Sequence, residues 1–214
     1  MIDLHTHTIF SDGELLPSEL VRRALVNGYE AIAITDHVDS SNIDFVVPRI
    51  VKAARRLNKF WKIKVLAGAE ISHVPLEEIG RLIRFARTCG ADIVLVHGET
   101  TMEPVIPGTN RAAIEGGADI VAHPGRISIA DAARAAKKGV CIEITTRKSH
   151  SVTNREAVSA ARRTGARLVL NTDTHVIKDI INHAKAVTFL KKLGLTSREI
   201  AQVFMNSRAL AQLA

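Results

Sequence analysis

The sequence has few cysteines and no long apolar run. Its 214 residues include two cysteines, Cys89 and Cys141, which form neither a CxxC pair nor a disulfide framework. The chain starts without the basic segment and apolar stretch of a secretory signal, and no apolar run reaches the roughly 18 residues of a membrane span. We therefore expect a reduced, cytoplasmic protein that does not enter a membrane.

Aromatic residues are also scarce, at 4% of the chain, which leaves little material for stacking on unpaired bases. No run of lysine and arginine is long enough to resemble a nucleic-acid-binding arm. The net charge is nevertheless +7, with a pI of 9.7. Such a charge favours an anionic partner, most simply a phosphorylated small molecule, although a solvated basic surface would give the same total. Nucleic acid is the less favoured partner.

Short apolar runs alternate with segments of helical periodicity along the whole chain. The expected strands are Ile2–Leu4, Ala31–Thr35, Val65–Ala69, Asp92–Val96, Asp119–Ala122, Val140–Ile144 and Arg167–Asn171. The expected helices are Pro17–Asn27, Asp44–Lys59, Leu76–Thr88, Asn110–Gly116, Ile129–Lys138, Asn154–Thr164, Ile180–Leu193 and Ser197–Leu213. This alternation predicts a parallel α/β sheet, because each helical crossover returns the chain to the same direction. A nearly closed barrel and an open doubly wound sheet both satisfy it.

Every expected strand ends in, or is followed directly by, a side chain of a type that binds metals. These side chains are His5, His7, Asp36, His37, Glu70, His97, His123, Glu143, Asp173 and His175. Since parallel strands share a direction, their carboxyl ends meet on the face where α/β enzymes build active sites. Three further histidines lie off this pattern: we expect His150 and His183 on the surface or in loops, and His73 is undecided.

The spacing of these residues indicates a metal centre. His5 and His7 point to the same side of a strand, and Asp173 and His175 repeat that geometry. Nitrogen and oxygen donors without sulfur suit Zn²⁺, Mn²⁺ or Fe. A single catalytic zinc takes about three protein ligands, so this many candidates predict two or three divalent ions.

Several short motifs together resemble the PHP (polymerase and histidinol phosphatase) family. They are His5–His7 (HTH), Ser11–Gly13 (SDG), Thr35–His37 (TDH), Gly68–Glu70 (GAE), His97-Gly98 (HG), His123–Gly125 (HPG) and Asp173–His175 (DTH). The resemblance implies a single domain over residues 1–214, folded as a distorted (β/α)7 TIM-like barrel with outer helices. It also implies a trinuclear site of Zn, Mn or Fe.

The resemblance further implies three ligand sets. One metal would be held by His5, His7, Glu70 and Asp173, and a second would share Glu70 and take His97 and His123. A third would take His37, His175 and Asp12, at a loop position where many relatives have histidine.

The expected reaction is attack on phosphorus by a metal-bound hydroxide. The residues expected to take part in catalysis are Asp36, His37, Arg126 and His175. Asp36 would orient a ligand histidine or, alternatively, cap the following turn. Arg126, Arg147 and Lys148 are expected to bind the substrate, because they follow strands on the active face and phosphate requires cations. Surface pairing is the alternative for all three.

A small-molecule phosphomonoesterase, similar to histidinol phosphatases, is the leading hypothesis for function. The alternatives are a PHP-type exonuclease or phosphodiesterase that acts on nucleic-acid ends and a non-catalytic RNA-binding barrel. The long loop 98–109 leaves the active face, so it could shape specificity. Its Glu99 and Glu103 could contact a metal or an amine of the substrate. A solvated loop is the alternative.

Overall fold

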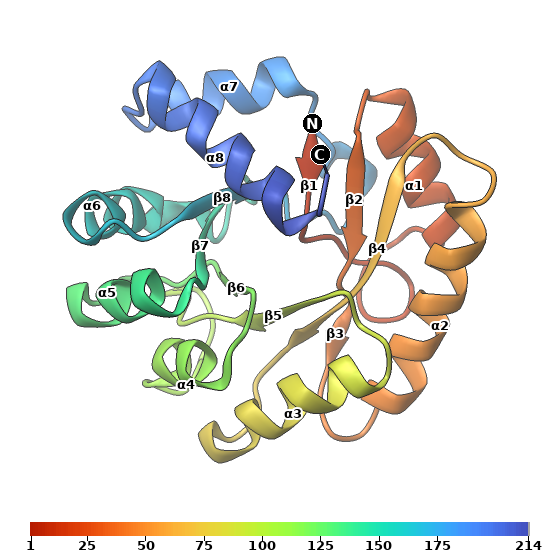
Figure 1. Ribbon diagram of the computed structural model, residues 1–214, viewed down its shortest axis with the longest axis horizontal. Helices are drawn as coiled ribbons and strands as arrows, with labels where there is room; N and C mark the ends of the chain where they lie inside the picture. Colours follow the sequence, from red (N-terminus) through yellow and green to blue (C-terminus); the bar gives the residue numbers. More distant parts are fainter. Residues whose placement is uncertain (214) are drawn as a thin grey trace.

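The strands of the computed structural model form a parallel sheet that curves into a nearly closed barrel (Figure 1). The structure describes residues 1–213. The barrel strands, in spatial order, are β1 (Ile2–Asp3), β2 (Ala31–Ile34), β4 (Lys64–Ile71), β5 (Ile93–His97), β6 (Ile120–Ala122), β7 (Cys141–Thr145) and β8 (Leu168–Asn171). All neighbouring strands are parallel. The predicted distorted (β/α)7 barrel is confirmed, and the open doubly wound alternative is wrong.

Helices surround the barrel on its outer side (Figure 1). They are α1 (Pro17–Val26), α2 (Ile43–Leu57), α3 (Leu76–Thr88), α4 (Thr109–Gly116), α5 (Ile129–Lys138), α6 (Asn154–Thr164), α7 (His183–Lys192) and α8 (Ser197–Leu210). Helix α7 begins three residues later than expected, because the Asn182 side chain caps it by accepting a hydrogen bond from the Lys185 amide. Within residues 1–213, no helix combines the length and the apolarity that crossing a bilayer requires.

A short strand that the sequence did not predict, β3 (His37–Val38), shares one edge of β4 with β2. Strand β2 pairs with residues 64–67 of β4, and β3 pairs with residues 70–71. Thr35 and Asp36 lie between them, and the Asp36 carbonyl accepts a hydrogen bond from the Glu70 amide at 3.1 Å. The register of the second pairing sets His37 directly beside Glu70.

Polar side chains close the seam between the first and last strands. The Asp3 carboxylate accepts a hydrogen bond from the Thr172 amide at 3.1 Å, and Asn171 accepts one from the Leu4 amide at 2.9 Å. Above them, the His7 amide donates to the Thr174 carbonyl at 2.8 Å. The seam therefore joins the two strands that carry the HTH and DTH motifs.

The barrel interior is apolar at the amino ends of the strands. Its buried cluster consists of Ile2, Leu4, Ala31, Ala33, Leu66, Ile93, Leu95, Ile120, Ala122, Cys141, Val169 and Ala211. Leu210 and Leu213, at the end of α8, pack against it and close this end of the barrel. A larger apolar cluster lies between the sheet and the outer helices. The opposite end, at the carboxyl ends of the strands, is left for polar side chains.

Gly68 in the middle of β4 has no room for a side chain. A Cβ atom there would lie 2.6 Å from Thr35 Cγ2 and 2.9 Å from Ile93 Cγ2. We expect Gly68→Ala to destabilise the protein by about 1–3 kcal/mol, as overpacked cores do. Chemical denaturation measures this change.

Gly80, inside α3, provides the matched control, since a Cβ there meets no atom closer than 3.6 Å. Gly80→Ala should stabilise the protein by roughly 0.5–1 kcal/mol, because alanine favours helix. Equal effects of the two substitutions would contradict the packing described for β4.

Candidate metal centre

The side chains predicted to bind metals come together at the carboxyl ends of the strands, around the buried carboxylate of Glu70. Five histidine rings approach this carboxylate. The distances from a Glu70 oxygen are 3.2 Å to His5 Nε2, 3.5 Å to His7 Nε2, 2.9 Å to His37 Nδ1, 3.3 Å to His97 Nδ1 and 3.4 Å to His123 Nε2. Residues far apart in the sequence therefore share one pocket.

Asp173 faces Glu70 across the same pocket. Its Oδ1 lies 3.2 Å from His7 Nε2 and 3.6 Å from His5 Nε2. His5 and His7, with Thr6 between them, point the same way, as the alternation of side chains along an extended chain requires. Their Nε2 atoms are 3.0 Å apart.

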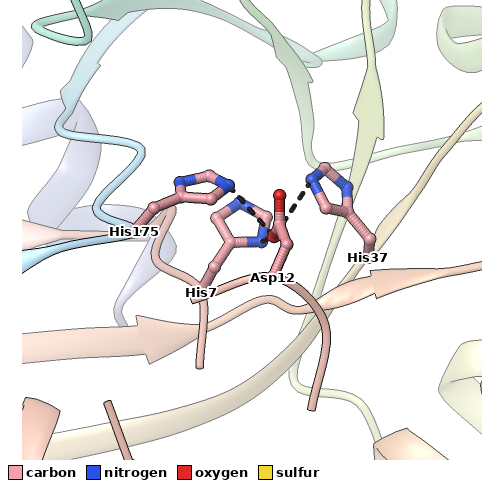
Figure 2. A group of neighbouring side chains, drawn as sticks. All are labelled: His7, Asp12, His37 and His175. Atoms are coloured by element: carbon pink, nitrogen blue, oxygen red, sulfur yellow. Dashed lines mark ion pairs between the residues drawn. The ribbon is translucent and has the colours of Figure 1, made fainter. Parts of the chain in front are cut away.

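A second group of donors forms around Asp12, which the loop after β1 carries (Figure 2). Asp12 Oδ1 lies 3.1 Å from His175 Nε2, 3.7 Å from His37 Nε2 and 3.8 Å from His7 Nδ1. Figure 2 shows the three rings turned toward this carboxylate. The three residues expected to form a third set, Asp12, His37 and His175, are thus neighbours, and His7 joins them.

Asp36 is fully buried and holds the loop that carries Asp12. Its carboxylate accepts hydrogen bonds from the Thr8 amide, the Thr8 hydroxyl and the Ser11 hydroxyl, each at 2.7 Å. These contacts stabilise the loop after β1, not the turn that follows Asp36, and the described hydrogen bonds of Asp36 reach no histidine directly. A catalytic role for Asp36 stays a prediction.

Glu143 lies behind His5 and fixes the orientation of its ring. Glu143 Oε2 is 2.8 Å from His5 Nδ1 and also accepts from Asn171 Nδ2, while Oε1 accepts from the His123 amide. Among the described residues, no lysine or arginine pairs with it. Because Nδ1 is bound by Glu143, His5 presents Nε2 to the pocket. Histidines that bind metals are commonly oriented by such a hydrogen bond to the other ring nitrogen.

Two of the converging residues have strained backbones. His123 has a φ of 26° and Asp173 a φ of 53°, values in the left-handed region that residues other than glycine rarely adopt. The bond from the His123 amide to Glu143 and the bond from Arg147 to the Asp173 carbonyl hold these conformations. Such strain costs about 1–3 kcal/mol per residue and clusters at functional sites.

The groups in the pocket shift one another's pKa values so that Glu70 is ionised and the histidine rings around it are either cationic or neutral. Burial alone would raise the pKa of Glu70, but His5, His37 and His97 outweigh it and hold that pKa well below its usual value. Burial opposes protonation of His5, yet Glu143 and Glu70 raise its pKa well above normal. Burial lowers the pKa of His7 to about 3, so this ring is neutral and keeps a lone pair.

Several buried polar atoms in the pocket form no hydrogen bond of normal geometry among residues 1–213, although most of them lie within ion-pair distance of other groups. They are both carboxylate oxygens of Glu70, both ring nitrogens of His97 and Nδ1 of His123. Leaving such groups unpaired costs about 1–3 kcal/mol each or more. Divalent cations would satisfy them, and imidazole with carboxylate is the donor set that Zn²⁺, Mn²⁺ or Fe prefers. The residues present therefore fit a metal centre.

The expectation that His150 lies on the surface or in a loop is wrong in one respect: it is a loop residue, but it is buried and lines the pocket. Its ring stacks on His123, with centroids 4.4 Å apart, and Nδ1 lies 2.7 Å from Thr100 Oγ1. Burial lowers the pKa of His150 to about 4. A loop after β7 that includes the short helix η1 (Ser151–Thr153) brings it there. His183 is exposed at the start of α7, as expected.

Glu103, from the loop 98–109, lies at the rim of the pocket rather than in solvent alone. Its carboxylate is 3.1 Å from His97 Nε2, 3.0 Å from His73 Nε2 and 3.4 Å from His150 Nε2. Contact with His97 lowers the pKa of Glu103 to about 2. Glu99 in the same loop instead accepts the Gly108 and Asn110 amides. The path of a long loop cannot be read from the order of its residues. The sequence alone therefore could not show that Glu103 reaches the pocket and Glu99 does not.

The three predicted substrate-binding residues take different positions. Arg147 lines the central pocket, a cavity of about 350 Å³, and donates to the Asp173 carbonyl and to His175 Nδ1. Lys148 is exposed and lines an adjoining groove. Arg126 is exposed and does not line the central pocket. The structure thus brings only one of them to the clustered histidines.

A family model described as the PHP domain matches residues 3–140. An uncharacterized protein of Methanocaldococcus jannaschii is 42% identical over 206 residues, which cover 95% of this chain and 94% of that protein. A probable phosphatase of Shewanella frigidimarina is 28% identical, with coverage of 91% and 85%. DNA polymerase/3'-5' exonuclease PolX of Bacillus subtilis is 25% identical over 97% of this chain but only 39% of its own length.

Among solved structures, a chain of archaeal ribonuclease P with mature tRNA superposes with a TM-score of 0.75 and 17% identity. The match covers 99% of this chain and 90% of the other. At this identity the likeness concerns the fold alone.

Adding a suitable cation to chelator-treated protein should raise its melting temperature, because the buried donors that lack hydrogen bonds gain a metal to coordinate. At 100 times its Kd, Zn²⁺ or Mn²⁺ should stabilise the fold by about 2.7 kcal/mol, which corresponds to about 5–11 °C for a chain of this size. Calorimetry measures the shift. Ca²⁺, which prefers oxygen ligands, is the control, and no shift with Zn²⁺, Mn²⁺ or Fe²⁺ would argue against a metal centre.

Proposed function

The chain belongs to the PHP domain family, and we propose that it is a metal-dependent hydrolase of phosphate esters, most simply a phosphomonoesterase acting on small molecules. One observation carries the proposal: a fully buried carboxylate, Glu70, is surrounded by five histidine rings and has no hydrogen-bond partner among the described residues. Such an arrangement is costly unless cations occupy it. The similarity to probable phosphatases supports the choice of substrate class.

Two or three divalent ions would be held by overlapping sets of side chains. The proposed ligands are His5, His7, Asp12, His37, Glu70, His97, His123, Asp173 and His175. Several subsets of these have donor atoms within 4.8 Å of one another. Bound ions would supply Lewis acidity toward phosphoryl oxygens and lower the pKa of water.

Arg147 would orient the substrate. Among the described residues, it is the only lysine or arginine that lines the central pocket. Its guanidinium contacts the Asp173 carbonyl and His175, so it lies at the edge of the histidine cluster. A guanidinium donates to two phosphoryl oxygens at once, which fixes the direction of the ester bond as well as adding charge.

The remaining polar residues would position the groups that touch the substrate. Glu143 holds the His5 ring, and Asp36 holds the loop of Asp12. His150 stacks on His123 with Nε2 3.4 Å from Glu103, and its lowered pKa keeps the ring neutral, so it would help to hold the substrate in the pocket. The proposed catalytic roles of His37 and His175 follow from their contacts with Asp12.

Action on nucleic-acid ends is the second candidate, which the similarity to PolX favours. A pocket of about 350 Å³ suits a phosphoryl group with a small leaving group, which supports the first candidate. A non-catalytic RNA-binding barrel is disfavoured. Buried donors without hydrogen bonds lower stability, and a scaffold would gain nothing from keeping them.

His7→Ala should remove bound metal and abolish phosphatase turnover while the chain stays folded. His7 approaches Glu70, Asp12 and Asp173, so its loss disrupts two donor groups at once. Elemental analysis of the purified protein, turnover of p-nitrophenyl phosphate and circular dichroism measure the three quantities. His183→Ala, at an exposed position, is the control and should change none of them.

Wild-type activity in metal-free His7→Ala would refute the proposed chemistry. A panel of phosphomonoesters against end-labelled oligonucleotides separates the two enzyme candidates. If only the oligonucleotides are cleaved, the small-molecule proposal is wrong and the nuclease alternative stands.

Arg147→Ala should lower kcat/KM more than Arg126→Ala does. Loss of a hydrogen bond to a charged group costs about 1.5–3 kcal/mol, which is roughly a 10- to 150-fold decrease at about 1.4 kcal/mol per factor of ten. Arg126, outside the pocket, should change kcat/KM less than about threefold, since exposed charges interact weakly. Steady-state kinetics on one phosphomonoester decides, and the reverse order would assign the substrate contact to Arg126.

A further inference from the structure

A wide groove adjoins the central pocket on the side of β8. Its volume is about 1040 Å³, and its walls come from the loop after β7, the end of β8, the short helix η2 (Ile177–Asp179) and helix α7. Arg147 and His175 line both the groove and the central pocket. The two cavities therefore meet at these residues.

The groove is strongly basic. Its lining includes Arg147, Lys148, Lys178, Lys185 and Lys192, and a single acidic residue, Asp179. The Asp179 carboxylate is already engaged, because it accepts hydrogen bonds from the His175 and Val176 amides. None of the four lysines forms an ion pair with a described residue, although exposed lysines elsewhere, such as Lys138, do.

Helix α7 arranges part of this charge as a stripe. Lys185 and Lys192 are seven residues apart, which is close to two turns, so both lie on the face that lines the groove. Their separation along the axis is roughly 10 Å at about 1.5 Å per residue. Thr188 and Phe189 lie between them on the lining, so the stretch between the charges is uncharged.

We propose that this groove binds a second phosphate group of the substrate, so that the preferred substrate carries two phosphates separated by an uncharged spacer. One phosphate would lie in the pocket beside Arg147, and the other would contact Lys185 and Lys192. This proposal rests on the proposed phosphoesterase function.

The central pocket and the groove differ in the number of their cationic side chains. Within the described chain, the central pocket has one cationic side chain besides its histidines, which suits one phosphoryl group. The four lysines of the groove repel one another without a stabilising partner, and an anionic ligand would reverse that cost. Lysine ammonium groups bind phosphate as point charges and do not require a fixed fork geometry.

Binding of non-hydrolysable ligands tests the groove directly. Alkane diphosphonates of four, six and eight carbons are compared with the alkyl monophosphonates of the same length by calorimetry. We expect at least one diphosphonate to bind about tenfold more tightly than its monophosphonate at low salt. The advantage should shrink as salt is added, because exposed charges are screened.

The variant Lys185→Ala/Lys192→Ala should lose this advantage and keep its affinity for monophosphonates. Lys137→Ala/Lys191→Ala is the charge-matched control. Lys137 and Lys191 are exposed and do not line the groove, and Lys191 belongs to the same helix as the tested pair. The control should therefore retain the preference for the diphosphonate.

Equal binding of all diphosphonates and monophosphonates would overturn the proposal, as would a preference that survives in Lys185→Ala/Lys192→Ala. Turnover supplies the second arm, with alkanediol bisphosphates compared with alkyl phosphates. If neither class is hydrolysed but the diphosphonate preference depends on the two lysines, the groove stands and the phosphoesterase function fails. If alkyl phosphates are hydrolysed without any preference for bisphosphates, the groove proposal fails and the function stands.

Discussion

The rest of the site depends on one interaction, the burial of the Glu70 carboxylate among imidazole rings. A buried carboxylate without compensation is far too costly to keep, so its surroundings must supply positive charge. His5, His37 and His97 supply part of it, which is why the pKa of Glu70 falls although burial acts in the opposite direction. Both Glu70 oxygens nevertheless lack a hydrogen-bond partner within residues 1–213. Structural ion pairs in proteins normally satisfy such atoms, so this deficit distinguishes the pocket from an ordinary buried salt bridge.

The barrel brings this cluster together through features of individual strands. Strand β4 is long enough to pair with β2 in its first half and with β3 in its second, and the second pairing sets His37 beside Glu70. At the seam, side chains such as Asp3 and Asn171 join β1 to β8 where a continuous ladder of backbone bonds is lacking. The residues of the HTH and DTH motifs, which open and close the barrel, thereby become neighbours.

The sequence predicted those parts of the site that regular structure positions. Residues directly after strands, such as His5, Glu70 and His123, were expected together because parallel strands share a direction, and the structure places them so. Strand β3 escaped prediction because it holds only two residues, one of them polar, and follows β2 after a break of two residues, so no apolar run marks it. The sequence missed His150 and could not tell Glu103 from Glu99, because these residues lie on long loops whose paths depend on tertiary contacts such as the bond between His150 and Thr100. Arg126 follows a strand yet is exposed. The shared direction of parallel strands thus predicts where the backbone of such a residue lies, but not where a long side chain points.

The composition did not decide whether the net positive charge serves an anionic partner or only a solvated surface. The placement of the charges in the pocket and the groove bears on this question. A net charge of +7 is consistent with a basic surface of any kind. In the structure, the pocket combines carboxylates with histidines, a donor set that suits metal cations, whereas the adjoining groove concentrates unpaired lysines, which suit an anion. Arg147 lies at the junction of the two and lines both. A ligand that satisfies both regions must present negative charge at each end, one to metal ions and the other to ammonium groups. Neither the total charge nor the metal-binding motifs predict such a ligand, because the groove forms only where α7 and the chain at the end of β8 line one cavity.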